Sequence, residues 1–247
     1  MNKPLELIGR WSLLTCAVAL LAGCPDRDDD DPAPDTALRE YSIQVTNLTY
    51  GQPVSPLVAS LHNSEVRLMR VGTAASVALE QLAESGANGD LLAQLDANAM
   101  TFNNVGGAGV LMPGMSETVT VSAEFDVAHT EPVQLSAVTM LVNTNDAITG
   151  FNGLDVTNLA VGDSITLTTV AYDAGTEANS ESADTVPGPA AAGGAQEGFN
   201  AQRDDIRDQV AMHAGVLTSD EGSMGSVLTN VHRFDNPVLR VVVTRMQ

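Results

Sequence analysis

The chain has 247 residues, with 31 acidic residues against 11 basic ones and a formal net charge of −20 at pH 7. A surface this acidic repels nucleic acid and anionic lipid and attracts divalent cations, so we expect no nucleic-acid partner. The only cysteines, Cys16 and Cys24, both lie near the N-terminus. The remaining chain therefore has no disulfide, no thiolate metal site and no catalytic thiol, and its fold must depend on its core.

The first 23 residues are predicted to be an export signal. Lys3 and Arg10 give it a positive start, an apolar run follows at residues 11–21, and small residues precede Cys24. This order of regions is typical of a secretory signal that is removed from the mature protein. The apolar run is too short to span a membrane comfortably, although a short membrane anchor remains an alternative.

The sequence Leu-Ala-Gly-Cys at 21–24 is typical of a bacterial lipobox, which predicts that Cys24 carries lipid and becomes the first mature residue. An ordinary secretory signal is the alternative. Pro25, rather than an aspartate, follows the cysteine, which favours the outer membrane or periplasm. Residues 24–39 are rich in aspartate and proline, and we expect an extended, acidic, disordered tether there.

Residues 40–247 are predicted to form one mainly β domain. Apolar and polar residues alternate in several short runs that are separated by turn residues, which is typical of an antiparallel β-sandwich. The last run, at 238–244, is apolar enough to predict a central strand. Strands are expected at 41–46, 57–61, 118–127, 133–142, 161–172 and 238–244.

Two short helices are expected between the second and third of these strands. The first runs from Ser76 to Ser85, where Leu79 and Leu82 share one face and Gly86 is a stop signal. The second spans 90–95, and we expect the pair to pack at one end or edge of the sandwich. Segment 200–213 has modest helical character, while 106–109 and 183–200 are interpreted as irregular, glycine-rich turns.

Two acidic residues stand where strand-like runs meet polar turns: Asp146 and Asp173. Strand ends hold side chains in fixed positions, and calcium requires several converging oxygens. Asp, Asn and Gly are also ordinary turn residues. Residue types alone therefore leave open whether these are simple acidic turns or a divalent-metal site.

Several segments resemble one known family. Asn145-Asp-Ala-Ile-Thr-Gly-Phe-Asn-Gly and Ala171-Tyr-Asp-Ala-Gly-Thr-Glu are similar to the central stretch of the spondin domain, found in F-spondin, mindin and many bacterial lipoproteins. Tyr41-Ser-Ile-Gln-Val-Thr-Asn-Leu-Thr resembles the opening strand of that domain. Asp235-Asn-Pro-Val-Leu-Arg-Val-Val-Val-Thr-Arg resembles its closing strand. The resemblance covers about residues 40–245.

The resemblance implies a β-sandwich that holds calcium through three acidic side chains. Transferred onto this sequence, two of the ligands are Asp146 and Asp173. The third falls on the preceding strand, at Asp126, with Glu124 as the fallback. Ala147 stands where animal members have an aromatic residue. The resemblance therefore implies the metal site more strongly than it implies the partners of the animal proteins.

The expected function is a lipid-anchored, calcium-binding domain that serves adhesion or binds a surface glycan or protein ligand. No histidine pair has ligand spacing, and no Gly-x-Ser-x-Gly elbow is present, so we expect no enzyme and no catalytic residue. The alternative is a carbohydrate-active or other hydrolytic lipoprotein that uses the same acidic cluster.

Overall fold

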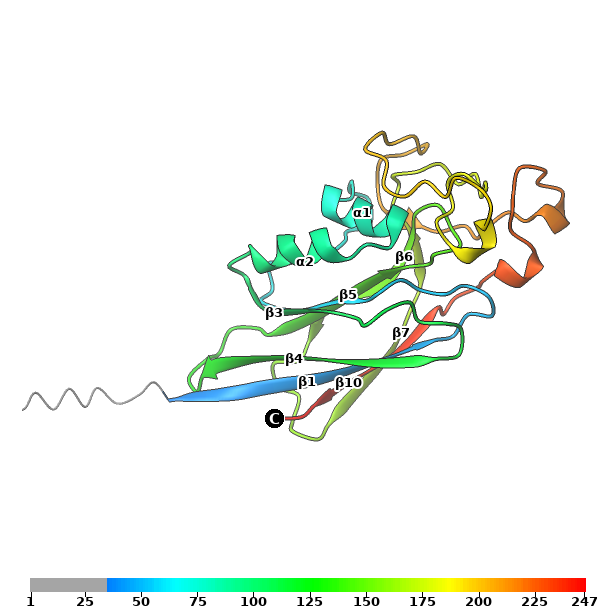
Figure 1. Cartoon of the computed structure of the whole chain (residues 1–247). Helices are drawn as coiled ribbons and strands as arrows, with labels where there is room; N and C mark the ends of the chain where they lie inside the picture. Colours follow the sequence, from blue (N-terminus) through cyan, green and yellow to red (C-terminus); the bar gives the residue numbers. More distant parts are fainter. Residues whose placement is uncertain (1–34) are drawn as a thin grey trace, which may run out of the picture. The chain divides into compact units, whose positions relative to one another are not determined.

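Two antiparallel sheets face each other in the computed structural model, which describes residues 35–247 (Figure 1). One sheet has four strands in the order β4-β1-β10-β7, and the other has six in the order β3-β2-β5-β6-β8-β9. The mainly β sandwich expected from the sequence is therefore confirmed. The strands are β1 (Thr36–Asn47), β2 (Val58–His62), β3 (Thr101–Gly106), β4 (Ser116–Asp126), β5 (Gln134–Met140), β6 (Ala147–Asp155), β7 (Ser164–Thr169), β8 (Ala171–Asp173), β9 (Ala211–Met212) and β10 (Leu239–Arg245).

Alternation of side chains along the strands builds the core between the two sheets. In β1, Tyr41, Ile43 and Val45 are buried and point inward, while the residues between them face outward. The inner face of the six-stranded sheet supplies buried partners such as Leu61 and Leu135. The period-two pattern thus identified both the strands and the faces that they bury.

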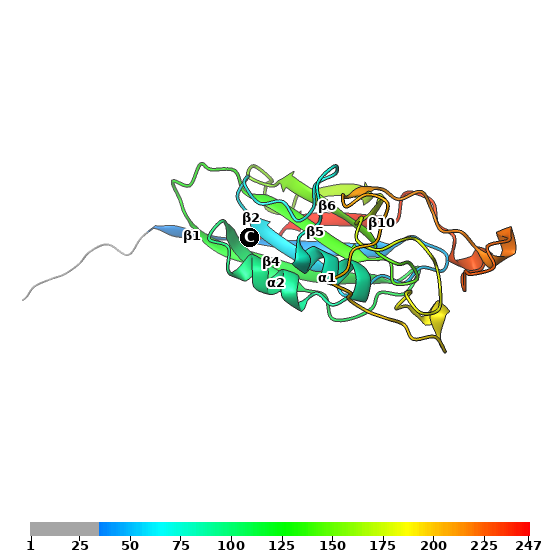
Figure 2. The ribbon, with the colours of Figure 1, turned by 90° about the horizontal axis from the view of Figure 1, so that it is seen from above.

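Two helices, α1 (Val77–Ser85) and α2 (Gly89–Asp96), cover the outer face of the six-stranded sheet. Leu79 and Leu82 of α1 join a second apolar cluster, which includes the strand residues Val58, Val138 and Ile148. The helices therefore lie over the sheet rather than capping one end of it, as the view from above shows (Figure 2). Their apolar stripe accounts for this position, because it needs an apolar partner surface.

The caps of α1 are those that the sequence predicts. The Ser76 hydroxyl accepts a hydrogen bond from Leu79 N at 3.2 Å, and Gly86 ends the helix in the left-handed region with φ 71°. The short helical turns are 3-10 helices at Pro189–Ala191, Ser219–Glu221 and Asn230–His232. Among residues 35–247, no helix is long and apolar enough to cross a membrane.

Three expectations about elements were wrong. The segment predicted as one strand at 161–172 is two strands in different sheets, because Thr169 pairs with Leu239 of β10 while Ala171 pairs with Thr149 of β6. Segment 200–213 is not helical and ends in the short strand β9. Strands β3 and β6 were not foreseen, because β3 does not alternate in polarity and β6 is interrupted by Gly150 and Gly153.

The folded domain also begins earlier than residue 40. Strand β1 starts at Thr36, which pairs with Asp126 of β4. Residues 36–39 thus belong to the sheet. Their pairing with β4 extends β1 beyond the residues that alternate in polarity. The predicted export signal and Cys24 lie outside the described residues.

The two ends of the sandwich carry different features. At the loop end, Asn47 closes β1 and donates to Gln52 O at 2.8 Å, and Gln52 in turn donates to Asn143 O at 3.2 Å. This end includes Asp146 and the segment 174–181. At the entry end, the chain enters β1 at Thr36, beside Asp126. The length of β1 separates the two ends, which is on the order of 35 Å for a strand of this size.

Candidate metal centre

Asp146 is held at the start of β6 by a tight polar turn. The Thr144 hydroxyl donates to Leu141 O at 2.6 Å and accepts from Ala147 N at 3.0 Å. Leu141 N also donates to Ala147 O at 2.8 Å, which closes the turn between β5 and β6. The result is an aspartate with 0% of its surface exposed.

One carboxylate oxygen of Asp146 fastens the loop that follows β8. Asp146 Oδ2 accepts from Thr176 N at 2.8 Å, from Thr176 Oγ1 at 3.2 Å and from Glu177 N at 3.2 Å. The neighbouring Asn145 holds the next part of the same loop, because its Oδ1 accepts from Glu181 N at 2.9 Å. The turn before β6 therefore determines the shape of the loop from residue 174 to 181.

Asp173 is the last residue of β8, and its register partner is Ala147. It therefore lies next to Asp146, across the β6–β8 ladder. Its Oδ1 accepts from Gly175 N at 2.8 Å, and its Oδ2 accepts from Asn179 Nδ2 at 2.6 Å. The structure thus brings together two of the three predicted ligands.

Gly175 explains why the loop carries a glycine after Asp173-Ala. Its φ is +73°, which lies in the left-handed region. A Cβ at this position would collide with Gln209 O and lie 2.6 Å from Gln209 N. The loop therefore passes so close to the segment before β9 that only glycine fits.

The two carboxylates interact unfavourably. Burial, and then the charge of Asp173, raise the pKa of Asp146 to about 7. Asp146 Oδ1 is buried and has no hydrogen-bond partner among the described residues. A cation bound at this buried, unpaired oxygen would offset its lost solvation and its repulsion from the second carboxylate.

Two glutamates beside this pair were not assigned from the sequence. Burial first, and then the charges of Glu84 and Asp146, raise the pKa of Glu177 to about 8. Glu84 of α1 is buried, which raises its pKa, and its Oε2 accepts from Asn200 N at 2.8 Å. The other oxygen of Glu84 and Oε2 of Glu177 have no partner within residues 35–247. For Glu84, the signal in the sequence was its position four residues after Glu80, on the same side of α1 and next to the apolar face.

His213 adds no positive charge to this end. Burial lowers its pKa, although the charge of Asp173 opposes the effect. Its Nδ1 accepts from Gly215 N at 2.9 Å, and its ring lies against Phe234 with the centroids 5.4 Å apart. A neutral imidazole therefore sits beside the acidic pair and leaves its charge uncompensated.

The third predicted ligand, Asp126, does not belong to this site. Asp126 ends β4 at the entry end, where it is exposed and its Oδ1 accepts from Ala128 N at 2.7 Å. The fallback Glu124 pairs with Leu38 at the same end. The structure therefore does not bring either residue together with Asp146 and Asp173, because β4 lies in the other sheet and ends at the entry end.

Asp146 and Asp173 thus offer two carboxylates rather than three. Among residues 35–247, no three His, Cys, Asp or Glu side chains are arranged to hold a metal ion. The unpartnered Asp146 Oδ1 fits a cation, and Glu177 is the nearest further acid with an unpartnered oxygen. The pair can hold a hard cation only together with other oxygens, such as backbone carbonyls and water.

The family model described as Spondin_N matches residues 44–191, which include Asp146, Asp173 and the loop at 174–181. No curated protein matches the chain.

Proposed function

Because the chain belongs to the spondin N-terminal domain family, we propose that it is an adhesive or ligand-binding domain whose loop end is ordered by calcium. The family indicates a location outside the cytoplasm. One observation carries the proposal: the fully buried Asp146 has an unpartnered carboxylate oxygen next to Asp173.

Calcium is the cation that suits this arrangement. Asp146 and Asp173 would hold it, together with backbone carbonyl oxygens and water, and the charge of the nearby Glu177 adds to the attraction for a cation. Bound calcium supplies positive charge that offsets the repulsion between these carboxylates. Asp146 also accepts hydrogen bonds from the backbone of residues 176 and 177. Because bound calcium would hold Asp146 in place, it would stabilise this loop as well.

The loops around this pair provide a surface for a ligand. A cavity of about 260 Å³ lies against Asp173 and is lined by Asn179, Arg207 and Met212, among others. An apolar side chain that lines this cavity, Ile206, is 95% exposed. Exposed apolar side chains near a fixed charge are common where proteins bind ligands or partners.

Membrane attachment through Cys24 is part of the proposal. The chain enters the domain at Thr36, at the end opposite Asp146. Attachment on the N-terminal side therefore leaves the loop end free for a ligand. Replacing Cys24 by Ser is expected to release the protein from membranes, whereas continued membrane association would exclude a lipid anchor at this residue.

We propose that the domain is not an enzyme, because Asp146, the acid at the centre of this site, has no exposed surface through which to reach a substrate. Raised carboxyl pKa values also occur in hydrolases that use general acids, so the hydrolytic alternative is tested directly. A glycan array with calcium or with a chelator distinguishes the two. Calcium-dependent binding without product release supports adhesion, while product release establishes the hydrolase.

A further inference from the structure

A second site lies on the outer face of the six-stranded sheet, away from the acidic pair. It is a cavity of about 320 Å³ between the segment 65–76, the start of α1 and one residue of α2. Five polar side chains other than acids line it: Arg67, Arg70, Thr73, Ser76 and Gln94. We propose that this cavity binds the carboxylate of an acidic sugar.

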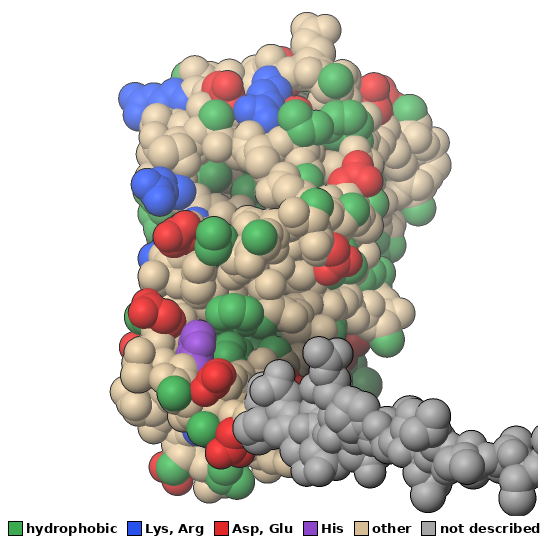
Figure 3. All heavy atoms as spheres, turned by 90° about the vertical axis from the view of Figure 1, so that its left-hand side faces the viewer, with side chains coloured by type: hydrophobic (Ala, Val, Ile, Leu, Met, Phe, Trp, Pro, Cys, Tyr) green, Lys and Arg blue, Asp and Glu red, His purple; other side chains and the backbone are tan. Residues whose placement is uncertain are grey.

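The charge of the cavity differs from that of the whole chain. The chain has 31 acidic residues and 11 basic ones, yet this cavity is lined by two arginines and only one acid, Glu65. In Figure 3, arginine side chains gather in the upper part of the face shown, while acidic side chains are scattered over it. A local positive site on an acidic surface attracts anions selectively.

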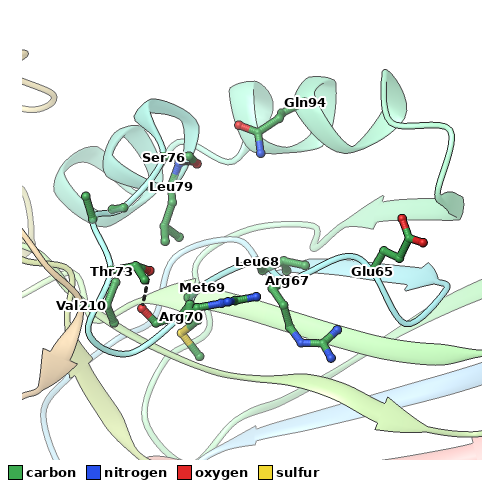
Figure 4. Close-up of a pocket in the computed structure, with 12 residues that line it drawn as sticks. Glu65, Arg67, Leu68, Met69, Arg70, Thr73, Ser76, Leu79, Gln94 and Val210 are labelled. Carbon is green, nitrogen blue, oxygen red and sulfur yellow. Dashed lines mark hydrogen bonds between the residues drawn. The ribbon is translucent and has the colours of Figure 1, made fainter.

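Arg70 is the principal anion-binding group. Its side chain is exposed and makes no hydrogen bond or ion pair within the described part of the chain. Arg67 is partly engaged, because its Nη1 donates to Ser64 O at 3.0 Å and to Val66 O at 2.6 Å. Figure 4 shows Arg70 on the lower side of the cavity, with Ser76 at the start of α1 and Gln94 on α2 above it.

The backbone on either side of Arg70 is fixed before any ligand binds. Asn152 of β6 accepts from Leu68 N at 2.8 Å and donates to Met69 O at 3.1 Å. Beyond Arg70, Gly72 N donates to Val210 O and Val210 N donates to Thr73 O, both at 2.8 Å. A ligand therefore loses little affinity to ordering of the loop.

The lining favours a sugar acid over a purely apolar acid. The planar fork of a guanidinium matches a carboxylate. The Thr73 hydroxyl donates to Arg70 O at 2.8 Å and can still accept from a sugar hydroxyl. The Ser76 hydroxyl accepts from Leu79 N at 3.2 Å and can still donate to one, and the Gln94 amide can do both. The volume lies at the lower end of the range for small-molecule sites, about 300–1,000 Å³, which fits a short segment of an acidic glycan.

The test is calorimetric titration of the purified full-length protein with an oligogalacturonate. Its methyl ester serves as the matched ligand without charge. The free acid is expected to bind and the ester to bind at least tenfold more weakly. Equal binding of the acid and the ester would overturn the proposal, as would competition by inorganic sulfate at the same concentration as the sugar acid.

Variants locate the binding site. Arg70→Ala is expected to weaken binding at least tenfold without affecting the fold, because the side chain has no intramolecular partner. Arg70→Lys should recover only part of the affinity, since lysine lacks the planar fork. Arg240→Ala removes the same charge from the exposed surface of β10, and binding should remain as in the wild type. Equal weakening by Arg70→Ala and Arg240→Ala would reduce the effect to net charge and overturn the assignment.

The site is independent of the calcium proposal, and the same titration separates them. Binding of the sugar acid is expected to persist in a chelator and in Asp146→Asn. If Asp146→Asn abolished binding while Arg70→Ala had no effect, the ligand would lie at the loop end and the cavity would not be its site.

Discussion

Asp126 and Asp146 both stand where a strand meets a polar turn, but they lie at opposite ends of the sandwich in opposite environments. Asp126 is exposed, and its carboxylate accepts a hydrogen bond within its own turn, from Ala128 N. Asp146 is fully buried and binds a loop that lies 30 residues further along the chain. One residue type thus serves a local turn at the entry end and joins distant segments at the loop end.

The difference shows that burial and partners, not residue type, separate a turn aspartate from a cation site. Water solvates the charge of Asp126, so it needs no counter-ion. At Asp146, burial and the neighbouring Asp173 destabilise the charged form, as the raised pKa indicates. Each prediction below tests this contrast.

The largest expected effect is a dependence of metal-free stability on pH. The pKa of Asp146 rises from 3.8 to about 7 on folding, so the folded chain binds a proton more tightly than the unfolded chain. The free energy of unfolding therefore falls as pH rises through this window, by on the order of 4 kcal/mol for this one group. Glu177, with a pKa of about 8, extends the fall to higher pH.

Urea denaturation in a chelator between pH 4.5 and 8.5 measures this dependence. Asp146→Asn removes this titrating group and should flatten the part of the curve that it causes, leaving the fall due to Glu177. It should also stabilise the metal-free protein at pH 8. A free energy of unfolding that rises with pH over this range would contradict the assignment.

The second effect is the loss of loop anchoring in Asp146→Ala. At pH 5 the carboxyl group is largely protonated, so the variant chiefly removes the acceptor of Thr176 N and Glu177 N. Leaving these groups unpaired is expected to cost about 3 kcal/mol of stability. Asp126→Ala is the matched variant at the entry end and should cost less than about 1 kcal/mol. Equal losses in urea denaturation would remove the distinction between the two ends.

The third effect is stabilisation by calcium. A calcium concentration of a hundred times Kd should stabilise the folded protein by about 2.7 kcal/mol, seen as an increase in Tm. Asp173→Asn and Asp146→Asn should abolish most of this increase, whereas Asp126→Asn should retain it. Magnesium should have a much smaller effect, because it demands stricter octahedral geometry.

Screening of a highly charged surface is the competing explanation for such an increase in Tm. It predicts that magnesium or sodium chloride has the same effect as calcium, and that all three variants respond like the wild type. That pattern would show that the loop end holds no specific cation.

The smallest effect compares two glycines with positive φ. Gly175→Ala adds a Cβ that collides with Gln209 O, and we expect a loss of about 2 kcal/mol or more. Gly162→Ala, near the entry end, has a similar φ of +88° but no atom within 4 Å of the added Cβ. Its loss should remain near the conformational cost alone, about 1 kcal/mol. Similar values of Tm for the two variants would mean that the close packing of the loop contributes nothing.

Local patterns were sufficient for much of the fold. Alternation identified the strand containing Tyr41, Ile43 and Val45, and Ser76 and Gly86 located the ends of α1. The change of sheet between Thr169 and Ala171 has no local signal, because an apolar run reads alike whether its two halves pair with one sheet or two. Similarly, segment 200–213 has helix-forming residues, but its backbone pairs with distant segments instead.

The candidate site was predicted in part for the same reason. Asp146 and Asp173 were identified because they lie in one compact stretch of recognisable motifs. Asp126 lies apart from them because its position depends on which sheet contains β4, and the alternation of polar and apolar residues along a strand does not determine this. Glu84 lies on a helix whose placement over the sheet was not expected, so nothing in its own segment connected it to Glu177.

The course of β1 determines how the domain bears mechanical load. β1 pairs with β4 on one side and with β10 on the other, and it runs from the entry end to the loop end. A chain held from its N-terminal side, with a ligand bound at the loops, is pulled along this strand. The ladder hydrogen bonds lie perpendicular to the strand, so the pull loads them together in shear rather than one after another. The fold thus resists extension along the line between its entry point and its loops, which is the direction of load under the adhesive function proposed above.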